Sequence, residues 1–385
     1  MKWEMIKLGE IIEFSNGINF DKSSYANGIK FISVSDFGNR FFPQYDDLSE
    51  VKKDVVSAND FLQEGDIVFV RSNGNKELVG RCMLIKDLPE PVTYSGFVIR
   101  GRIADHSKYD PVFLTYYFKS KAFRHKMSGT AVGANIQNLS QGRLTAYTAR
   151  IPDFYSQRLI ADILSAYDDL IENNQKQIKL LEEAAQRLYK EWFIDLRFPG
   201  HENTPIHNGV PEGWKMGFLG QLSEFKRGQT ITKAEVQNGI IPVVAGGLEP
   251  AYYHNIANTS APVITVSGSG ANAGFTRMYH VNVFASDCSF ADYNSTPFLE
   301  YVYCVLIEKK KDLRSMQKGS AQPHVYAKDI NRLPVFIPNK KLLESFCEVT
   351  KQFYEQSSFL EKQIIKLTEA RDRLLPKLMS GELKI

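Results

Sequence analysis

The chain has 385 residues, of which 43% are hydrophobic and 12% aromatic, and its formal net charge at pH 7 is +3. This composition predicts a chain that is folded throughout, with room for two domains that each bury a core. Because the uncharged apolar runs are too short to span a membrane and residues 1–7 lack an apolar signal core, we expect a cytoplasmic protein. The net charge is too small to identify a partner. If the partner is DNA, the positive charge must be concentrated locally.

The cysteines are scattered along the chain without a Cys-x-x-Cys pair, at Cys82, Cys288, Cys304 and Cys347. Regularly spaced or paired cysteines are typical of disulfide frameworks and zinc sites. We therefore expect four buried, reduced thiols and no metal site.

In the first half, apolar runs bounded by turn residues predict strands at residues 31–35, 66–70 and 97–100, and a short helix at residues 111–118. Two polar loops with small residues, 71–76 and 128–138, could approach DNA closely. Arginine and lysine side chains suit guanine, and asparagine and glutamine side chains suit adenine. The candidate DNA-binding residues of this half are Arg71, Ser72, Asn73, Asn75, Lys76, Asn135, Gln137 and Asn138.

Residues 156–198 predict a long helix, because apolar residues recur at alternating spacings of four and three, as in a coiled coil. About 35 residues at ~1.5 Å each would form a rod of roughly 50 Å. The alternative is an amphipathic helix that covers only its own domain. The predicted helix-pairing residues are Ile160, Leu164, Tyr167, Ile171, Asn174, Ile178, Leu181, Ala185, Leu188 and Trp192.

A proline-containing linker is predicted at residues 199–213, before the second half begins. That half has predicted strands at 241–245 and 263–267 and a predicted helix at 297–303. Its polar loops, 267–272 and 318–324, follow the second strand and precede the last long helix. The candidate DNA-binding residues here are Ser267, Ser269, Asn272, Lys318, Ser320, Gln322 and His324.

Residues 341–385 predict a second long helix with the same seam, which Pro376 and Gly381 are expected to limit. Thr350, Ser357 and Arg371 interrupt this seam, and polar seam residues can determine register at some cost in stability. The predicted helix-pairing residues are Phe346, Phe353, Leu360, Ile364, Leu367, Leu374 and Leu378.

The two halves form an internal repeat. Residues 3–17 and 214–228 share Trp, Met, Leu, Gly, Glu, Phe and Gly without a gap, and residues 176–188 and 362–374 share a second set in the same order. Taken singly, each polar loop is more typical of an ordinary surface turn. Because the loops recur at corresponding places in the two halves, the repeat favours a role of these loops in DNA recognition. We predict a first recognition domain at 1–155, a helical spacer at 156–198, the linker at 199–213, a second recognition domain at 214–340 and a helical spacer at 341–385.

Catalytic motifs are missing from the sequence. It contains no G-x-x-x-x-G-K-[ST] loop, no Pro-Pro pair of an amino-methyltransferase loop and no metal-binding histidine spacing. The glycine-rich residues 268–274 lack dinucleotide-binding spacing. Glu308-Lys309-Lys310 has the spacing of a nuclease Glu-x-Lys, but a solvated charge run is the better interpretation. We therefore predict no catalytic and no metal-binding residues.

These features resemble the specificity subunit of Type I restriction–modification enzymes. The resemblance is carried by Pro-Glu-Gly-Trp at 211–214, Leu-Tyr-Lys-Glu-Trp-Phe at 188–193 with Arg-Phe-Pro-Gly at 197–200, and Leu-Leu-Pro-Lys-Leu-Met-Ser-Gly-Glu-Leu at 374–383. It covers essentially the whole chain. It implies an α+β fold, in which two mixed α/β target-recognition domains are joined by two long antiparallel coiled-coil helices in a pseudo-twofold internal repeat.

The resemblance also implies a non-catalytic subunit, in which each recognition domain reads one half of a bipartite, asymmetric site in double-stranded DNA. Two methylation subunits would supply S-adenosylmethionine chemistry on adenine, and restriction subunits would use ATP and Mg²⁺, so this chain would hold no cofactor. Exposed helix residues such as Lys179, Glu182, Glu183 and Arg187 would dock the methylation subunits. The alternative is a coiled-coil scaffold without sequence-selective DNA binding. A self-contained nuclease or methyltransferase would need motifs that the sequence lacks.

Overall fold

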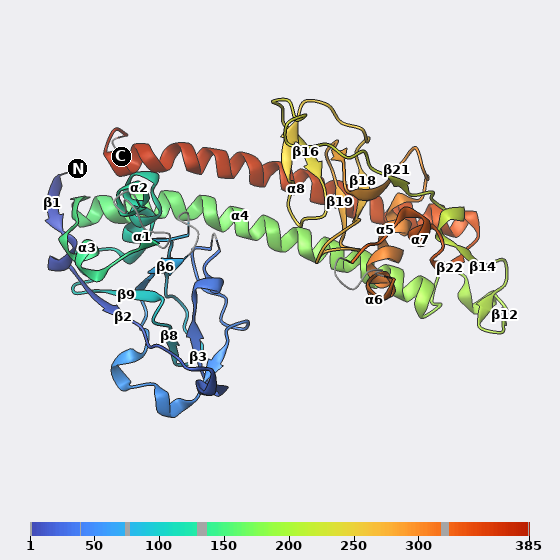
Figure 1. Ribbon diagram of the computed structural model, residues 1–385. Coiled ribbons are helices and arrows are strands. Elements are labelled where there is room, and N and C mark those ends of the chain that lie inside the picture. Colours follow the sequence, from blue (N-terminus) through green and yellow to red (C-terminus); the bar gives the residue numbers. More distant parts are fainter. Residues whose placement is uncertain (1, 39, 74–77, 129–136, 317–322, 384) are drawn as a thin grey trace. The chain divides into compact units, whose positions relative to one another are not determined.

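The computed structural model describes residues 2–38, 40–73, 78–128, 137–316, 323–383 and 385. The chain divides into two compact units: unit 1 comprises Met1–Glu172 and Ile365–Ile385, and unit 2 comprises Asn173–Ile364. The long helices α4 (Phe154–Tyr189) and α8 (Lys340–Ser380) each contribute residues to both units (Figure 1). Each unit therefore contains a segment of both helices together with its own sheets.

Unit 1 is built on a four-stranded sheet in the order β2–β9–β5–β7, in which all neighbours are antiparallel. The β-branched and aromatic run Ile-Val-Phe-Val makes β5 a buried strand along its whole length. Phe69 of β5 packs edge-on against Phe118 of helix α1, with ring centroids 5.2 Å apart. The elements are β1 (Trp3–Lys7), β2 (Ile12–Asn16), β3 (Tyr25–Ile32), β4 (Glu50–Val51), β5 (Ile67–Val70), β6 (Ser72–Asn73), β7 (Cys82–Leu84), β8 (Val92–Tyr94), β9 (Val98–Ile103), α1 (Pro111–Lys119), α2 (Lys121–Ser128), β10 (Gln137–Asn138), α3 (Gln141–Ala146) and β11 (Thr148–Pro152).

Unit 2 repeats this plan with a four-stranded sheet in the order β15–β21–β18–β19. A smaller sheet, β17–β16–β20, contains one parallel pair, as does β4–β3–β8 in unit 1. The elements are β12 (Ile206–His207), β13 (Val210–Pro211), β14 (Lys215–Phe218), β15 (Lys226–Arg227), β16 (Ile241–Val244), β17 (Tyr252–His254), β18 (Val263–Ser267), β19 (Thr276–Tyr279), β20 (Phe284–Ala285), β21 (Cys288–Asp292), α5 (Leu299–Glu308), α6 (Lys310–Ser315), α7 (Ala327–Asn331) and β22 (Pro334–Ile337).

The residues matched in the sequence repeat have matched structural roles. Leu8 and Leu219 are both fully buried, and each begins a short 3₁₀ turn that directly follows a strand, β1 in unit 1 and β14 in unit 2. A Cβ atom added to Gly17 would lie 2.3 Å from the carbonyl oxygens of Tyr94 and Ser95, and one added to Gly228 would lie 2.4 Å from that of Ser286. Only glycine fits where the chain crosses this backbone so closely, which explains why the repeat keeps a glycine there.

The two long helices pair in an antiparallel manner within unit 2. Asn174 on α4 donates a hydrogen bond from Nδ2 to Oε1 of Gln363 on α8, at 3.2 Å. Further along α4, the ring of Tyr189 contacts that of Phe346, with centroids 6.3 Å apart. In these two contacts the residue number rises along α4 while it falls along α8, so the helices run in opposite directions. The prediction of two long antiparallel helices is confirmed.

The polar residues of the α8 seam have partners. Thr350 and Ser357 each donate a hydrogen bond to the carbonyl oxygen four residues earlier, at 2.9 and 3.0 Å. In unit 1, Arg371 forms ion pairs with Asp168 of α4 and with Asp372. These contacts let polar groups lie in a mostly apolar seam without unsatisfied hydrogen bonds.

Every predicted helix-pairing residue is buried or half-buried, while most positions between them on the outer faces are exposed. The expected stop at Pro376 is wrong, since α8 continues through this proline to Ser380. Beyond it, Leu378 and Met379 are buried in the unit 1 core, and this burial holds the last turn in helical form. Gly381, with a positive φ of 74°, then ends the helix as predicted.

Other local predictions differ from the structure in detail. The predicted strand at 31–35 ends at Ile32, because Ser33 and Asp36 close a capped 3₁₀ turn through hydrogen bonds from Ser33 to the Asp36 carboxylate. The segment predicted as a linker carries the β12–β13 hairpin, and Val210 packs against the unit 2 core. This segment is therefore ordered by packing against unit 2, which its prolines alone do not indicate.

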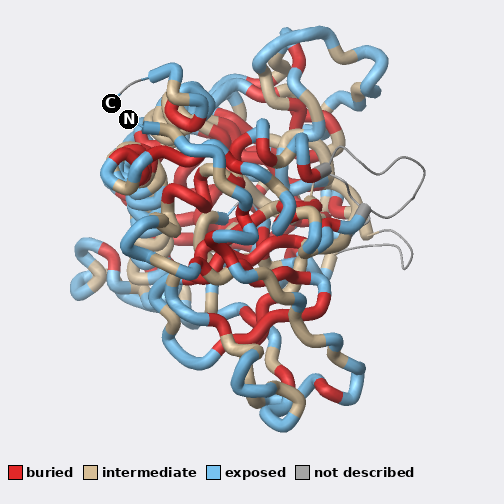
Figure 2. Tube along the Cα trace, turned by 90° about the vertical axis from the view of Figure 1, so that its left-hand side faces the viewer, coloured by how far each residue is buried: buried red, intermediate tan, exposed pale blue. Residues whose placement is uncertain are grey.

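Buried residues, shown in red in Figure 2, gather inside the fold, and the peripheral loops are largely exposed. All four cysteines are buried free thiols, which confirms their predicted burial. Within the described ranges, no helix combines the length and apolarity that crossing a membrane requires.

Candidate nucleic-acid interface

The two polar loops predicted in the first half meet in unit 1. Ser72 and Asn73 of β6 pair antiparallel with Asn138 and Gln137 of β10. The backbone N–H of Leu139 donates to the carbonyl oxygen of Arg71 at 2.8 Å. Residues 71–73, directly after the central strand β5, are therefore held against residues 137–139, shortly before α3.

Arg71 is attached to a third segment, the turn between β8 and β9. Its backbone N–H donates to the Phe97 carbonyl oxygen at 2.8 Å, and its Nη1 donates to the Gly96 carbonyl oxygen at 3.1 Å. One guanidinium N–H is thus used to orient the side chain, while arginine has several more that can bind a ligand.

Unit 2 has the same arrangement. Ser269 forms an antiparallel bridge with His324, and Val325 N–H donates to the Gly268 carbonyl oxygen at 3.0 Å. The Gly268 N–H donates to the Asp287 carbonyl oxygen, also at 3.0 Å. The loops predicted to contact DNA therefore converge in both units, at the same end of the central strand.

Three side chains add aromatic and charged groups to the unit 2 loops. The rings of His324 and Tyr326 are stacked, with centroids 5.8 Å apart and an interplanar angle of 10°. The Lys328 ammonium lies 5.6 Å from the centre of the Tyr326 ring. Stacked rings and a nearby cation are groups that nucleic-acid interfaces use for bases and phosphates.

The family of the chain follows from its similarity to a known domain. The model of the Type I restriction modification DNA specificity domain matches residues 1–183 and 211–369. The chain belongs to this family. DNA target recognition is the role of the family, which therefore favours the DNA-binding interpretation over a scaffold.

Known specificity subunits resemble the chain over most of its length. The Type I restriction enzyme MjaIX specificity subunit of Methanocaldococcus jannaschii is 28% identical over 304 residues, which cover 71% of this chain and 69% of that protein. The HindI specificity subunit of Haemophilus influenzae is 22% identical, with 99% of each chain covered. A solved Type I restriction–modification S subunit from M. genitalium superposes with a TM-score of 0.60 at 17% identity, covering 98% of this chain and 96% of that one. This last similarity supports the fold.

Only some of the predicted DNA-binding residues of this specificity subunit lie in the described parts of the converging loops. Arg71, Ser72, Asn138, Ser269 and His324 lie in the converging loops, and Asn272 is half-buried just after them. For Asn73 and Gln137 only the backbone is described. The candidates outside the described residues are Asn75, Lys76, Asn135, Lys318, Ser320 and Gln322.

The candidate DNA-binding residue Ser267 lies inside the sheet and not in the exposed part of its loop. Ser267 is the last residue of β18, is only 3% exposed, and donates its hydroxyl hydrogen to the Gly246 carbonyl oxygen at 3.1 Å. Ser267 thus ends the predicted strand 263–267, and the loop itself begins at Gly268.

Phe97 and Asp287 lie beside the converging loops but are not among the candidates predicted from the sequence. Phe97 falls in the predicted strand 97–100, but it occupies a turn between β8 and β9 and is 60% exposed. Gly96 directly before it was the available turn signal. Asp287 accepts a hydrogen bond from the Ser269 hydroxyl, a contact between residues that nothing in the sequence connects.

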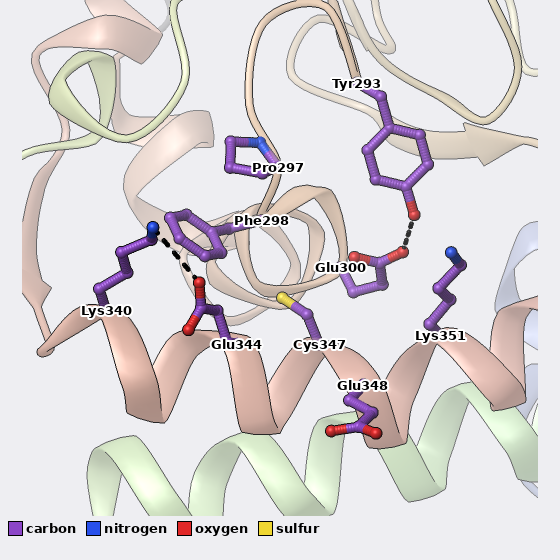
Figure 3. A pocket seen from close by; sticks show the side chains of 9 residues that line it. All are labelled: Tyr293, Pro297, Phe298, Glu300, Lys340, Glu344, Cys347, Glu348 and Lys351. Carbon is purple, nitrogen blue, oxygen red and sulfur yellow. Dashed lines mark hydrogen bonds and ion pairs between the residues drawn. The ribbon is translucent and has the colours of Figure 1, made fainter.

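Unit 2 also contains a cavity of about 410 Å³ between the start of α5 and the first turns of α8 (Figure 3). Tyr293 donates a hydrogen bond to Glu300 within it, and Lys340 forms an ion pair with Glu344 at 3.4 Å. Burial raises the pKa of the Glu300 carboxyl. The lining residues are Tyr293, Pro297, Phe298, Glu300, Lys340, Glu344, Cys347, Glu348 and Lys351, none of which belongs to the converging loops.

Proposed function

We propose that the chain selects a two-part DNA sequence, and that each recognition domain, 1–155 and 214–340, reads one part. The observation that carries this proposal is the repeated convergence of loops at the end of the central strand, β5 in unit 1 and β18 in unit 2. The two frames are alike, but the loop residues differ. Different side chains on a common frame are what an asymmetric, bipartite site requires.

The loop chemistry supports base reading. In unit 1, the Arg71 guanidinium is oriented by the Gly96 carbonyl and suits guanine, while the exposed Asn138 suits adenine. In unit 2, Ser269 and His324 offer smaller polar groups beside the Tyr326 ring. The two units would therefore favour different bases.

We propose that this chain supplies no catalytic group. Burial raises the pKa of the Cys82 thiol to about 11 and those of Cys288, Cys304 and Cys347 to about 12. A nucleophilic cysteine needs a lowered pKa and access to solvent, so these thiols are structural. S-adenosylmethionine, ATP and Mg²⁺ would act on partner subunits.

The partners that we propose are two methylation subunits, together with restriction subunits. The outer helix faces offer a docking surface that mixes charged and apolar groups. Lys179 and Arg187 are exposed, and Arg187 lies 3.6 Å from Glu183 in an ion pair. Large apolar side chains also lie exposed on these helices, a feature typical of interaction sites. They include Leu170, Leu180, Phe359 and Ile365.

The proposal is tested by single-molecule sequencing of methylated adenines in a host that carries the complete system, before and after deletion of this chain. We expect a bipartite methylated motif that disappears on deletion and returns on complementation. A motif that persists without the chain would contradict the proposal. A scaffold without sequence selectivity would leave the purified complex with no salt-sensitive preference for that motif.

A further inference from the structure

Phe97 and Asp287 occupy the same position in the two units. The carbonyl oxygen of Phe97 accepts from the N–H of Arg71, and that of Asp287 accepts from the N–H of Gly268. Arg71 and Gly268 also correspond, because each is the residue directly after the central strand of its unit. The carbonyl oxygen of each accepts a hydrogen bond from a backbone N–H shortly before a short helix, Leu139 before α3 and Val325 before α7. Backbone hydrogen bonds thus establish an equivalence that the side chains would not suggest.

The Phe97 side chain is presented by a tight turn. Val98 N–H donates to the Ser95 carbonyl oxygen at 2.9 Å, which leaves Gly96 and Phe97 at the tip. The ring is 60% exposed, although one exposed phenylalanine is ordinary on a protein surface. Its place is not ordinary, because the same turn holds the Arg71 guanidinium through Gly96. The turn therefore carries an exposed apolar side chain and also anchors a cationic one.

Asp287 presents a carboxylate at the equivalent position. Its Oδ2 accepts a hydrogen bond from the Ser269 hydroxyl, which orients the group. A Cβ atom at Gly268 would lie 3.2 Å from the other oxygen, Oδ1, so the glycine keeps that oxygen uncrowded. A carboxylate with one oriented and one available oxygen can accept a further hydrogen bond.

We propose that Phe97 and Asp287 are specificity-determining residues that make the two halves of the DNA site differ. This inference rests on the proposed function. In the major groove, an apolar ring contacts the thymine methyl group, and a carboxylate accepts a hydrogen bond from the amino group of cytosine or adenine. Phe97 reads a thymine in one half-site, and Asp287 reads an amino-bearing base in the other.

The test uses the complete restriction–modification complex carrying Phe97→Ala or Asp287→Asn. Methylated motifs are sequenced in the host, and binding is measured on duplexes with each base replaced in turn. We expect Phe97→Ala to lower discrimination about tenfold at a single thymine position of one half-site. Asp287→Asn should do the same at one cytosine or adenine position of the other half-site, and all other bases should keep their preferences.

Met5→Ala and Met216→Ala serve as matched controls, since these exposed residues lie on β1 and β14 and pair in the sheets with Arg150 and Phe336. They should leave every base preference unchanged. If Phe97→Ala fails to assemble with its partners, Phe97→Asn, which suits a turn, replaces it and is assessed by the same criterion.

The outcomes separate the two proposals. An unchanged motif in both variants, with a wild-type motif that depends on this chain, overturns the inference and leaves the proposed function intact. Loss of discrimination in both half-sites from one substitution also overturns it. A wild-type motif that survives deletion of the chain overturns the proposed function itself.

Discussion

Arg371 interrupts the apolar seam of α8, and its guanidinium forms ion pairs with Asp168 and Asp372 in unit 1. Asp168 also accepts a hydrogen bond from the Tyr116 hydroxyl at 2.5 Å. The Asp168 and Arg371 side chains are 24% and 26% exposed, so the pair is only partly screened by water. It holds the end of α8 against α4 and α1.

Replacing Arg371 with methionine should therefore destabilise unit 1. The substitution keeps the apolar stem but leaves the Asp168 carboxylate without its cation, at a cost of roughly 1–3 kcal/mol after allowance for partial exposure. Equilibrium urea unfolding of the full chain measures the loss. Arg373→Met is the matched control, because Arg373 is 82% exposed and should change stability by less than about 0.5 kcal/mol. Equal losses in the two variants would contradict this account.

Glu300 makes the stability of unit 2 depend on pH. The carboxyl is almost fully buried, and this burial raises its pKa, while the hydrogen bond from Tyr293 acts in the opposite direction (Figure 3). Because the folded-state pKa exceeds the unfolded value near 4.5, folding favours the protonated form. The contribution of Glu300 is complete below that unfolded value and is lost as pH rises through the folded pKa.

Glu300→Gln should consequently be more stable than the wild type at pH 8, and the advantage should shrink as the pH falls toward 5. Glutamine keeps a carbonyl oxygen for the Tyr293 hydroxyl but carries no charge to desolvate. Urea unfolding at several pH values measures the difference. Glu344→Gln, at a 56% exposed side chain on the same cavity, should show no such trend. The same trend in both variants, or a larger advantage at low pH, would refute the role of burial.

At the scale of elements, the paired helices are expected to set the spacing between the two half-sites. The seam runs through both units without a break in α4 or α8. One heptad adds about 10.5 Å to a helix, which corresponds to about three base pairs of DNA. Both helices must be lengthened together, because Asn174 and Gln363 pair across them.

Inserting one seam-compatible heptad after Glu172 and another after Ile364 should lengthen the non-specific spacer by about three base pairs. The bases of each half-site should stay the same, since neither recognition loop is touched. Sequencing of methylated motifs measures both properties. An insertion in α4 alone, which breaks the pairing register, serves as the control and should abolish methylation. An unchanged spacer in the double insertion would contradict the role of the helices as a ruler.

At the scale of the whole molecule, the repeat predicts modular reading. Each unit has its own sheets, core and converging loops. Replacing residues 1–150 with those of a relative that reads another sequence should therefore change one half-site and leave the other intact. The methylated motif of the hybrid measures this directly. A change in both halves would show that the recognition domains do not read DNA independently.

The fold was largely predictable because its signals are local. Seven matched residues revealed the repeat at its start, and alternating spacings of four and three revealed the helices. Buried strands such as β5 and β18 were visible as β-branched runs. Each matched segment, helix and strand is recognised from residues that are neighbours in the sequence or on one helical face.

The candidate site was only partly predictable. Sequence reasoning found the loops that contain Arg71 and His324, but not that each loop pairs with another one far along the chain. Ser267, predicted as a DNA-binding residue at the junction of strand and loop, is buried, and Phe97, within a predicted strand, lies in an exposed turn. The differences arise because burial and turn position depend on strand register, which neighbouring residues do not specify.

By itself, the sequence determined that one architecture is used twice, with two seamed helices and different polar loops. Only the tertiary structure decided that these loops converge beside β5 and β18, that α8 continues through Pro376, and that Phe97 and Asp287 are equivalent. The physical reason is the range of the interactions. Periodicity and turn chemistry act between near neighbours, whereas hydrogen bonds between distant segments and burial of Leu378 in the unit 1 core exist only once the chain has folded.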